Sequence, residues 1–271
     1  MHKIAKILSS QASQSAIYKA LTGFFMFLSI SVLVRFLGEI GYGVWVLVFG
    51  FFQWGLYFDF GISNVLKSKI PELISTQKEH LIEKYVSQSF FLTLIISLLF
   101  LSIATVFIYT NNLSSFFNIN LEDHFLKSIF ILNAIFFCIN FLLSINKSLY
   151  IGTLNPKISE KGATLTQVTF FIALLLIFTF FKNFSIAHKL LWITIINGSS
   201  NLFINGYYLI AFLKDKKIKL FAFNRFEKDI TKQILQNGLK FMLIQLFMVV
   251  VFFSDPYFIA YYSGPKDVSI S

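Results

Sequence analysis

Two apolar runs, at residues 14–37 and 42–64, limit what this chain can fold into more than any other feature of its sequence. Each is longer than the roughly 20 residues with which an α-helix crosses about 30 Å of hydrocarbon. A short polar hinge at residues 35–41 joins them. The pair therefore predicts a transmembrane helical hairpin.

The composition extends this prediction to the whole chain. Of its 271 residues, 56% are hydrophobic and 13% are charged, whereas soluble domains carry about 25% charged residues. Backbone amides in lipid must pair within their own segment, and no run alternates with period two, so only helices are expected. We predict an all-α, polytopic membrane bundle of about seven transmembrane helices. The five further runs lie near residues 85–109, 125–150, 162–182, 187–213 and 235–262.

The spacing of these runs suggests three parts. Residues 1–213 form a lobe of six helices, residues 214–234 form a basic linker, and residues 235–271 begin a second lobe. Because the pattern stops after one helix of that second lobe, we expect a fragment, a truncated product or a half that needs a partner chain.

The distribution of Lys and Arg predicts the orientation. The connections on one side carry 16 of these residues and those on the other side carry five. The side with 16 includes the N-terminus, which is therefore expected to be cytoplasmic, with the C-terminus outside. The net charge of +10 then reflects topology and contact with anionic membrane lipids, and no nucleic acid is expected as a partner.

The connection at residues 64–84 allows two interpretations. Leu66, Ile70, Leu73 and Ile74 recur at helical spacing among lysines, which fits an amphipathic helix in the cytoplasmic interface. A solvated loop fits the same residues equally well.

Polar residues inside the apolar runs mark where function is expected, because hydrocarbon disfavours them unless they face a cavity or one another. They share one helix face in several runs, which predicts a polar central cavity. The alternative is that they only join neighbouring helices by hydrogen bonds. By run, they are Ser15, Lys19, Thr22 and Ser29; Gln53 and Asp59; Asn133, Asn140, Ser144 and Lys147; Asn197, Asn201 and Asn205; and Lys240, Gln245 and Asp255. The site residues that we expect to line the cavity are Lys19, Arg35, Asp59, Asn140, Asn197, Asn201, Asn205, Lys240, Gln245 and Asp255.

The charged residues in and beside these runs also have explanations that involve no bound ligand. Lys19 either faces the cavity or extends to the cytoplasmic headgroups, and Arg35 is either a ligand contact or an interfacial anchor. Asp59 either caps the backbone amides of residues 63–64 or pairs with Lys19. Lys240 can extend to the headgroups in the same way, and Asp255 can lie in solvent.

Catalytic patterns are missing from the sequence. The four histidines are scattered over the termini and loops, Cys138 is the single cysteine, and no glycine-rich phosphate loop or suitably spaced pair of carboxylates occurs. We therefore expect no enzyme, no bound metal and no cofactor.

Two segments resemble a known family. VRFLGEIGYGVW at residues 34–45 and LYFDFGISNVL at residues 56–66 are similar to the N-terminal signature of the polysaccharide flippases, the O-antigen and capsule-unit translocases of the multidrug/oligosaccharidyl-lipid/polysaccharide exporter superfamily. Residues 254–271 resemble the first helix of that family's second lobe. The matching positions are Arg35, Leu37, Gly38, Tyr42, Gly43, Trp45, Asp59 and Gly61, followed by Asp255 and Gly264.

The resemblance implies a transporter of the bacterial inner membrane. It would move undecaprenyl-pyrophosphate-linked oligosaccharide to the outer leaflet by alternating access between two six-helix lobes with a cationic cavity. Lys19 and Lys240 open the first helix of each lobe and are expected to bind one anion together. The implied partners are the lipid-linked oligosaccharide and membrane lipids, with a polysaccharide polymerase and a chain-length regulator as further candidates.

Two other functions remain open at this stage. A small-molecule or drug exporter of the same superfamily would share the fold but should have a more acidic cavity. A membrane scaffold without transport activity, assembling with a polymerase or glycosyltransferase, would need no second lobe.

Overall fold

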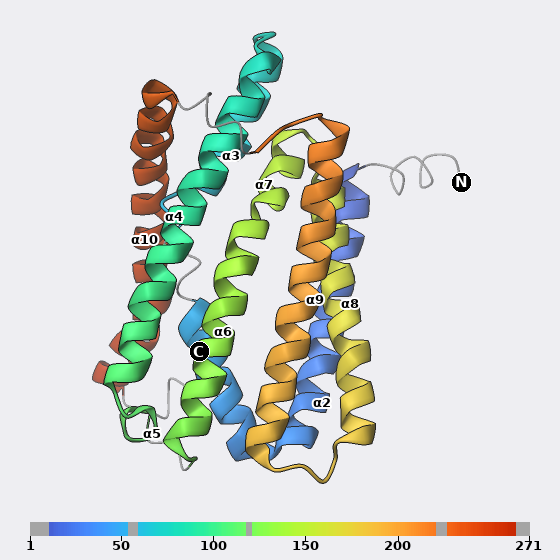
Figure 1. Cartoon of the computed structure of the whole chain (residues 1–271), viewed down its shortest axis with the longest axis vertical. Helices are drawn as coiled ribbons and strands as arrows, with labels where there is room; N and C mark the ends of the chain where they lie inside the picture. The colour runs from blue at the N-terminus through green and yellow to red at the C-terminus, as the bar shows by residue number, and fades with distance from the viewer. Residues whose placement is uncertain (1–10, 54–58, 118–120, 221–226, 264–271) are drawn as a thin grey trace.

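The computed structural model describes residues 11–53, 59–117, 121–220 and 227–263, with the side chains of residues 53, 246 and 248–263 left aside. Helices make up all regular structure in these residues (Figure 1). They are α2 (Gln11–Gln53), α3 (Ile62–Ser75), α4 (Ile82–Thr110), α5 (Leu113–Phe116), α6 (Asp123–Leu143), α7 (Ile145–Gly152), α8 (Pro156–Phe180), α9 (Ile186–Asp215) and α10 (Lys228–Ser263), with a 3-10 turn at Glu79–Leu81.

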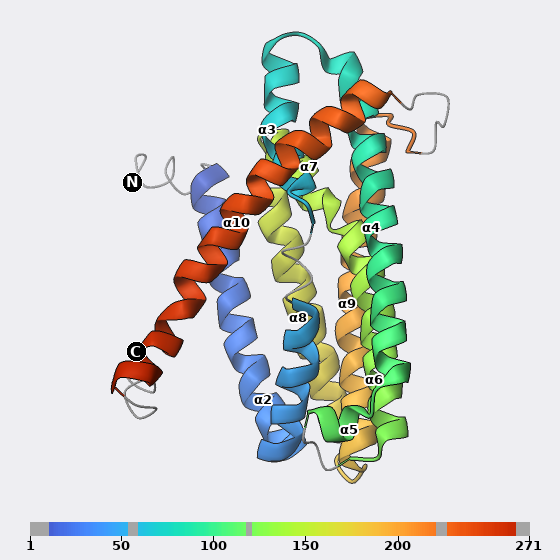
Figure 2. The same cartoon turned by 90° about the vertical axis from the view of Figure 1, so that its left-hand side faces the viewer.

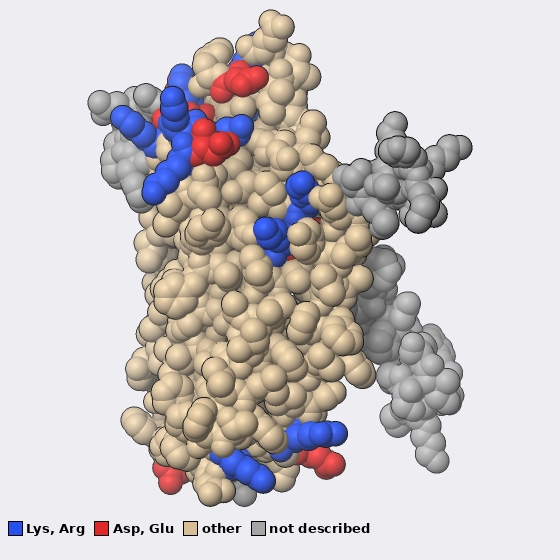
Figure 3. Space-filling model, turned by 90° about the vertical axis from the view of Figure 1, so that its right-hand side faces the viewer, with Lys and Arg blue, Asp and Glu red and all other residues tan. Residues whose placement is uncertain are grey.

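The predicted class, a helical membrane bundle, is confirmed. Four helices in the described residues are long and apolar enough to cross a membrane, namely Gln11–Phe52, Glu79–Thr110, Asp123–Gly152 and Pro156–Phe180. The first of them contains the first run of the predicted hairpin and the beginning of the second. The 30-residue helix α9 is not among the four, because its asparagines lower its hydropathy. Figure 3 shows a broad belt without charged side chains between the two ends of the bundle.

The predicted hairpin turns at Gly38, inside α2. Gly38 has φ 72° and ψ 172°, a conformation that side chains other than hydrogen disfavour. The two halves of α2 meet at the lower end of the bundle (Figure 2). Lys189 of α9 stabilises the end of the first half, because its Nζ donates to the Phe36 carbonyl at 3.1 Å and lies 4.9 Å from the centre of the Phe36 ring.

The second predicted run, 42–64, is not one continuous helix. α2 ends at Gln53, and α3 begins at Ile62 after a turn in which Phe60 and Gly61 both have positive φ. The buried carboxylate of Asp59 holds this turn. It accepts the Gly61 amide at 2.8 Å and the Ser63 amide at 3.2 Å.

Of the two interpretations of Asp59, capping is therefore correct for Ser63. The Asn64 amide instead donates to the Gly61 carbonyl. Pairing with Lys19 is wrong, since Lys19 is exposed and no ion pair between described residues includes it.

For residues 64–84, the helical interpretation is correct over α3, but its apolar face packs against the protein. Leu66, Ile70 and Leu73 are at most 2% exposed, because α3 packs between α7 and α10. The apolar face of α3 thus belongs to the protein interior, where neighbouring helices give it closer contacts than lipid would.

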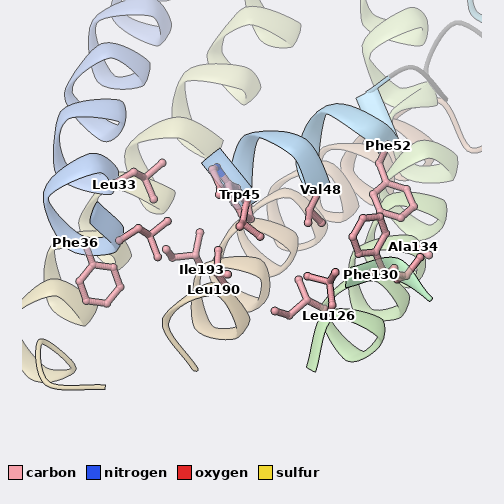
Figure 4. Close-up of a cluster of buried hydrophobic side chains, with 14 of the residues drawn as sticks. Leu33, Phe36, Trp45, Val48, Phe52, Leu126, Phe130, Ala134, Leu190 and Ile193 are labelled. Atoms are coloured by element: carbon pink, nitrogen blue, oxygen red, sulfur yellow. The ribbon is translucent and has the colours of Figure 1, made fainter. Parts of the chain in front are cut away.

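Two groups of buried side chains hold the helices together. The lower group joins the hairpin of α2 to α4, α6, α8 and α9, with Phe52, Phe130 and Leu190 among its members (Figure 4). The upper group joins α3, α4, α7, α9 and α10. The space between α2, α6 and α9 lies next to the lower group, and it contains the site described below.

We expect Asp59→Ala to destabilise the protein, because two buried amides lose their acceptor. The loss should be about 0.5–2 kcal/mol in free energy of unfolding, measured as a lower melting temperature of the purified protein in detergent. Asp59→Asn should lose less, since it keeps one acceptor. Lys19→Ala is the control and should change nothing; an equal loss from Lys19→Ala would contradict the capping role.

Candidate functional site

Helices α6 and α7 run parallel to α9, and a ladder of hydrogen bonds from polar side chains joins them. The sequence separation of the paired residues stays between 58 and 61 along the ladder, as parallel helices require. The rungs are Asn133 Nδ2 to Thr194 Oγ1 (3.1 Å), Asn140 Nδ2 to the Gly198 carbonyl (3.1 Å), Asn146 Nδ2 to Asn205 Oδ1 (3.3 Å) and Tyr150 OH to the Tyr208 carbonyl (3.1 Å).

A glycine permits the close approach of these helices. A Cβ atom at Gly198 of α9 would lie 2.2 Å from the ring of Phe136 of α6. The ring therefore lies directly on the backbone of α9. Small residues at helix contacts in membrane proteins serve this purpose, and here the contact forms one wall of a cavity.

The cavity has a volume of about 250 Å³ and lies between α2, α6, α7 and α9. Its wall combines amides, one cation and aromatic rings. The polar lining consists of Asn133, Asn140, Ser144, Lys147, Asn197, Asn201 and Asn205, and the rest is Gly198 with Phe49, Phe52, Phe136, Phe137 and Phe141. No carboxylate lines it among the described residues. The structure thus brings together four of the predicted site residues, Asn140, Asn197, Asn201 and Asn205.

These amides divide between the two roles considered for them. The Asn205 side chain accepts from Asn146 and so contributes to packing, and Asn201 Nδ2 donates to the Asn197 carbonyl. By contrast, Asn140 Oδ1 is buried without a hydrogen-bond partner among the described residues. The carboxamide of Asn197 is only partly buried, and no described residue hydrogen-bonds to it. Unsatisfied buried acceptors are rare in native proteins and call for an explanation.

Lys147 supplies the positive charge of the cavity. It belongs to α7, is partly buried, and has no hydrogen bond or ion pair within 4 Å among the described residues. Glu160 of α8 attracts it from a greater distance. In the sequence, Lys147 shares a predicted helix face with Asn140 and Ser144, but it is not among the residues predicted to line the cavity. Its spacing from Asn140, two helical turns, was the signal for including it.

The other predicted site residues lie elsewhere. Lys19, Arg35 and Lys240 are exposed, and none of them lines the cavity. Gln245 is partly buried, and its Oε1 has no described partner. The side chain of Asp255 lies outside the described residues. That Lys19 and Lys240 bind one anion stays a prediction.

The polar face predicted for residues 15–29 contacts α8 rather than the cavity. Thr22 and Thr164 share a hydrogen bond of 3.0 Å between their hydroxyls. Further along, Gln167 Nε2 donates to the buried Ser29 hydroxyl at 3.4 Å. These residues therefore join two helices.

The family-motif residues serve the geometry of the hairpin. Gly38 and Gly61 have positive φ, and Trp45 is buried with its ring stacked on Phe49 at 5.2 Å. Phe49 in turn lines the cavity. Tyr42 is partly buried, and a Cβ atom at Gly43 would meet nothing within 4 Å. Among the described residues, no group of three His, Cys, Asp or Glu is placed to hold a metal ion.

We predict that Gly198→Ala lowers the free energy of unfolding by about 1–3 kcal/mol, as overpacking does, because the new methyl group meets the Phe136 ring. Adding Phe136→Ala should cancel part of this loss in a double-mutant cycle. Gly23→Ala, where nothing lies within 4 Å, is the control. If Gly198→Ala melts at the temperature of Gly23→Ala, the close contact is wrong.

Comparison with known proteins agrees with this architecture. A model of the family described as "Polysaccharide biosynthesis protein" matches residues 12–270. A search of the curated proteins and a search of the solved structures gave no match. The match spans nearly the whole chain and confirms the resemblance carried by residues 34–66. This multi-pass membrane protein belongs to the polysaccharide biosynthesis protein family, which contains the polysaccharide flippases of the multidrug/oligosaccharidyl-lipid/polysaccharide exporter superfamily.

Proposed function

We propose that the chain is a transporter subunit that carries lipid-linked oligosaccharide repeat units across the bacterial inner membrane, and that it is not an enzyme. The observation that carries this proposal is the cavity between α2, α6, α7 and α9, with its unpaired cation and unpaired amides inside an apolar bundle. Membership of the polysaccharide biosynthesis protein family supports the proposal.

The chemistry of the cavity suits such a cargo. Carboxamides both donate and accept hydrogen bonds, so Asn140 and Asn197 can bind sugar hydroxyls. Aromatic rings such as Phe49 and Phe137 offer flat apolar faces to the C–H faces of a sugar. Lys147 can make a charge-assisted hydrogen bond to a phosphate or carboxylate oxygen.

The same lining argues against export of cationic drugs. A buried cationic ligand needs a compensating negative charge, and Lys147 would repel it. In the described residues the lining contains a lysine and no Asp or Glu. A small anionic or neutral solute would fit the lining, and the export assay below separates it from a lipid-linked unit.

We assign the upper end of the bundle in Figure 1 to the cytoplasm. Helix α2 begins at this end (Figure 1), and most of the Lys and Arg on the face drawn in Figure 3 lie toward it, as positively charged cytoplasmic connections require. Lys147 lies in α7, in the upper part of the bundle. A cargo entering from the cytoplasm would thus meet its charge before the deeper amides. In this proposal α10 begins the second lobe, and a polymerase and a chain-length regulator act on the exported unit.

We expect Lys147→Gln to reduce export at least about tenfold, since charged hydrogen bonds contribute about 1.5–3 kcal/mol. The measurement is complementation of a strain that lacks its own repeat-unit flippase, with surface polysaccharide as the readout and expression checked by immunoblot. The full gene product is used, including any downstream continuation of the reading frame.

Lys161→Gln is the matched control, because it removes one exposed positive charge from α8 at the same end. It should export normally. Equal export by both variants at equal expression would contradict the role of Lys147. Failure of the unmodified full product to restore any polysaccharide would favour a scaffold or a small-molecule exporter.

A further inference from the structure

Helix α3 is held between two other helices by contacts in which backbone meets backbone. On one side, a Cβ atom at Gly61 would lie 2.2 Å from the carbonyl oxygen of Gly238 in α10, and a Cβ atom at Gly238 would lie 2.2 Å from the carbonyl oxygen of Phe60. No side chain separates the two backbone segments here. A displacement of α10 toward α3 cannot be absorbed by a change of rotamer.

The opposite side of α3 meets α7 in a similar way. A Cβ atom at Gly152 would lie 3.1 Å from both the Leu66 carbonyl oxygen and the Ile70 Cβ. Leu66 and Ile70 are fully buried. Interiors packed this closely transmit displacement rather than dissipate it. α3 therefore has the geometry of a rigid strut from α10 to α7.

α7 is the part of the cavity wall that α3 contacts. The helix that begins at Asp123 ends at Leu143, and α7 starts at Ile145, so the two meet at Ser144 in the cavity lining. Asn146 Nδ2 spans this joint, because it donates to the Leu143 carbonyl at 2.7 Å and lies 3.3 and 3.4 Å from the two oxygens of Asn205. Lys147 moves with α7.

α10 is fixed at its upper end and diverges below. Tyr85 OH of α4 donates to Gln233 Oε1 at 2.6 Å, and Thr231 Oγ1 donates to Gln88 Oε1 at 3.0 Å. Figure 2 shows α10 crossing the bundle diagonally and leaving it. Beyond Gly238, Leu243 and Phe247 are 55% and 69% exposed. The contact with Gly61 lies near the point of divergence, where a tilt of α10 would act on α3.

We propose that α3 couples the tilt of α10 to the position of α7, and so sets the access of Lys147 to the aqueous side. In this coupling α10 tilts about the Gly61–Gly238 contact. The displacement of α3 reaches α7 at Gly152, and α7 turns relative to α6 at Ser144. The use of this coupling in transport rests on the proposed function. The coupling itself is a property of the packing and needs no cargo.

The test uses the single native cysteine. In a Cys138→Ala background, Lys147→Cys is the reporter, and its rate of reaction with a soluble maleimide is measured in membrane vesicles of the full chain. Gly238→Ala places a methyl group against the Phe60 carbonyl and should change the labelling rate at least threefold. Gly43→Ala, where a Cβ meets nothing within 4 Å, should leave it unchanged. Equal rates for these two variants would overturn the proposal.

Unfolding is separated from coupling by a second reporter. Ser29→Cys lies buried against α8 and should remain unlabelled in the Gly238→Ala variant. If it becomes labelled, the Gly238→Ala variant has unfolded, and the decision passes to Tyr85→Phe combined with Thr231→Val. This pair releases α10 from α4 without adding an atom to the contact, and it too should change the rate at position 147 at least threefold. An unchanged rate would overturn the proposal.

The two proposals fail separately. If the labelling rate is insensitive to α10 while Lys147→Gln still abolishes export, the strut is wrong and the proposed function stands. If labelling responds to α10 but Lys147→Gln exports normally, the coupling stands and the cargo site is wrong.

Discussion

Polar groups inside an apolar bundle must find partners, and the rest of this structure depends on how that constraint is met between α6, α7 and α9. Four side chains of α6 and α7 donate hydrogen bonds to α9 and fix both helices in parallel register with it. They are Asn133, Asn140, Asn146 and Tyr150. Gly198 allows the approach that these bonds require. With these helices in place, the hairpin of α2 closes the third side, and a cavity remains that side chains do not fill.

The same constraint supports the cargo that we propose for the cavity. A bundle that only needed stability would satisfy or replace its buried polar groups, since unpaired ones cost free energy. Here two residues that line the cavity keep polar groups without hydrogen-bond partners among the described residues, namely Asn140 with its Oδ1 and Lys147 with its ammonium group. A phosphorylated, hydroxyl-rich cargo provides what both groups lack. The polar face of residues 15–29 shows the contrast, because Thr22 and Ser29 are satisfied by α8 and line no cavity.

Much of this fold follows from the sequence, and the reasons for the exceptions are physical. Hydropathy was sufficient to predict a hairpin that turns within residues 35–41, where the structure places Gly38, and helical spacing placed Asn140, Asn197, Asn201 and Asn205 on shared faces. The break before α3 was missed, because an apolar run does not reveal where Asp59 and Gly61 end a helix. Lys19 was chosen for the cavity and Lys147 was not, whereas Lys147 lines it and Lys19 does not. The position of a lysine along one helix does not show which other helices surround it. The apolar face of α3 was expected to face the membrane, and it packs against neighbouring helices for the same reason.

The most direct test of the central claim is to find where the cargo touches the protein. A lipid-linked oligosaccharide that carries a diazirine on its sugar is bound to the full chain in nanodiscs and activated by light, and the modified peptides are identified by mass spectrometry. The account predicts crosslinks within residues 133–147 and 197–205, reduced by an excess of unmodified cargo. Crosslinks confined to the surroundings of Lys19 and Lys240 would contradict it and would restore the anion site first expected there.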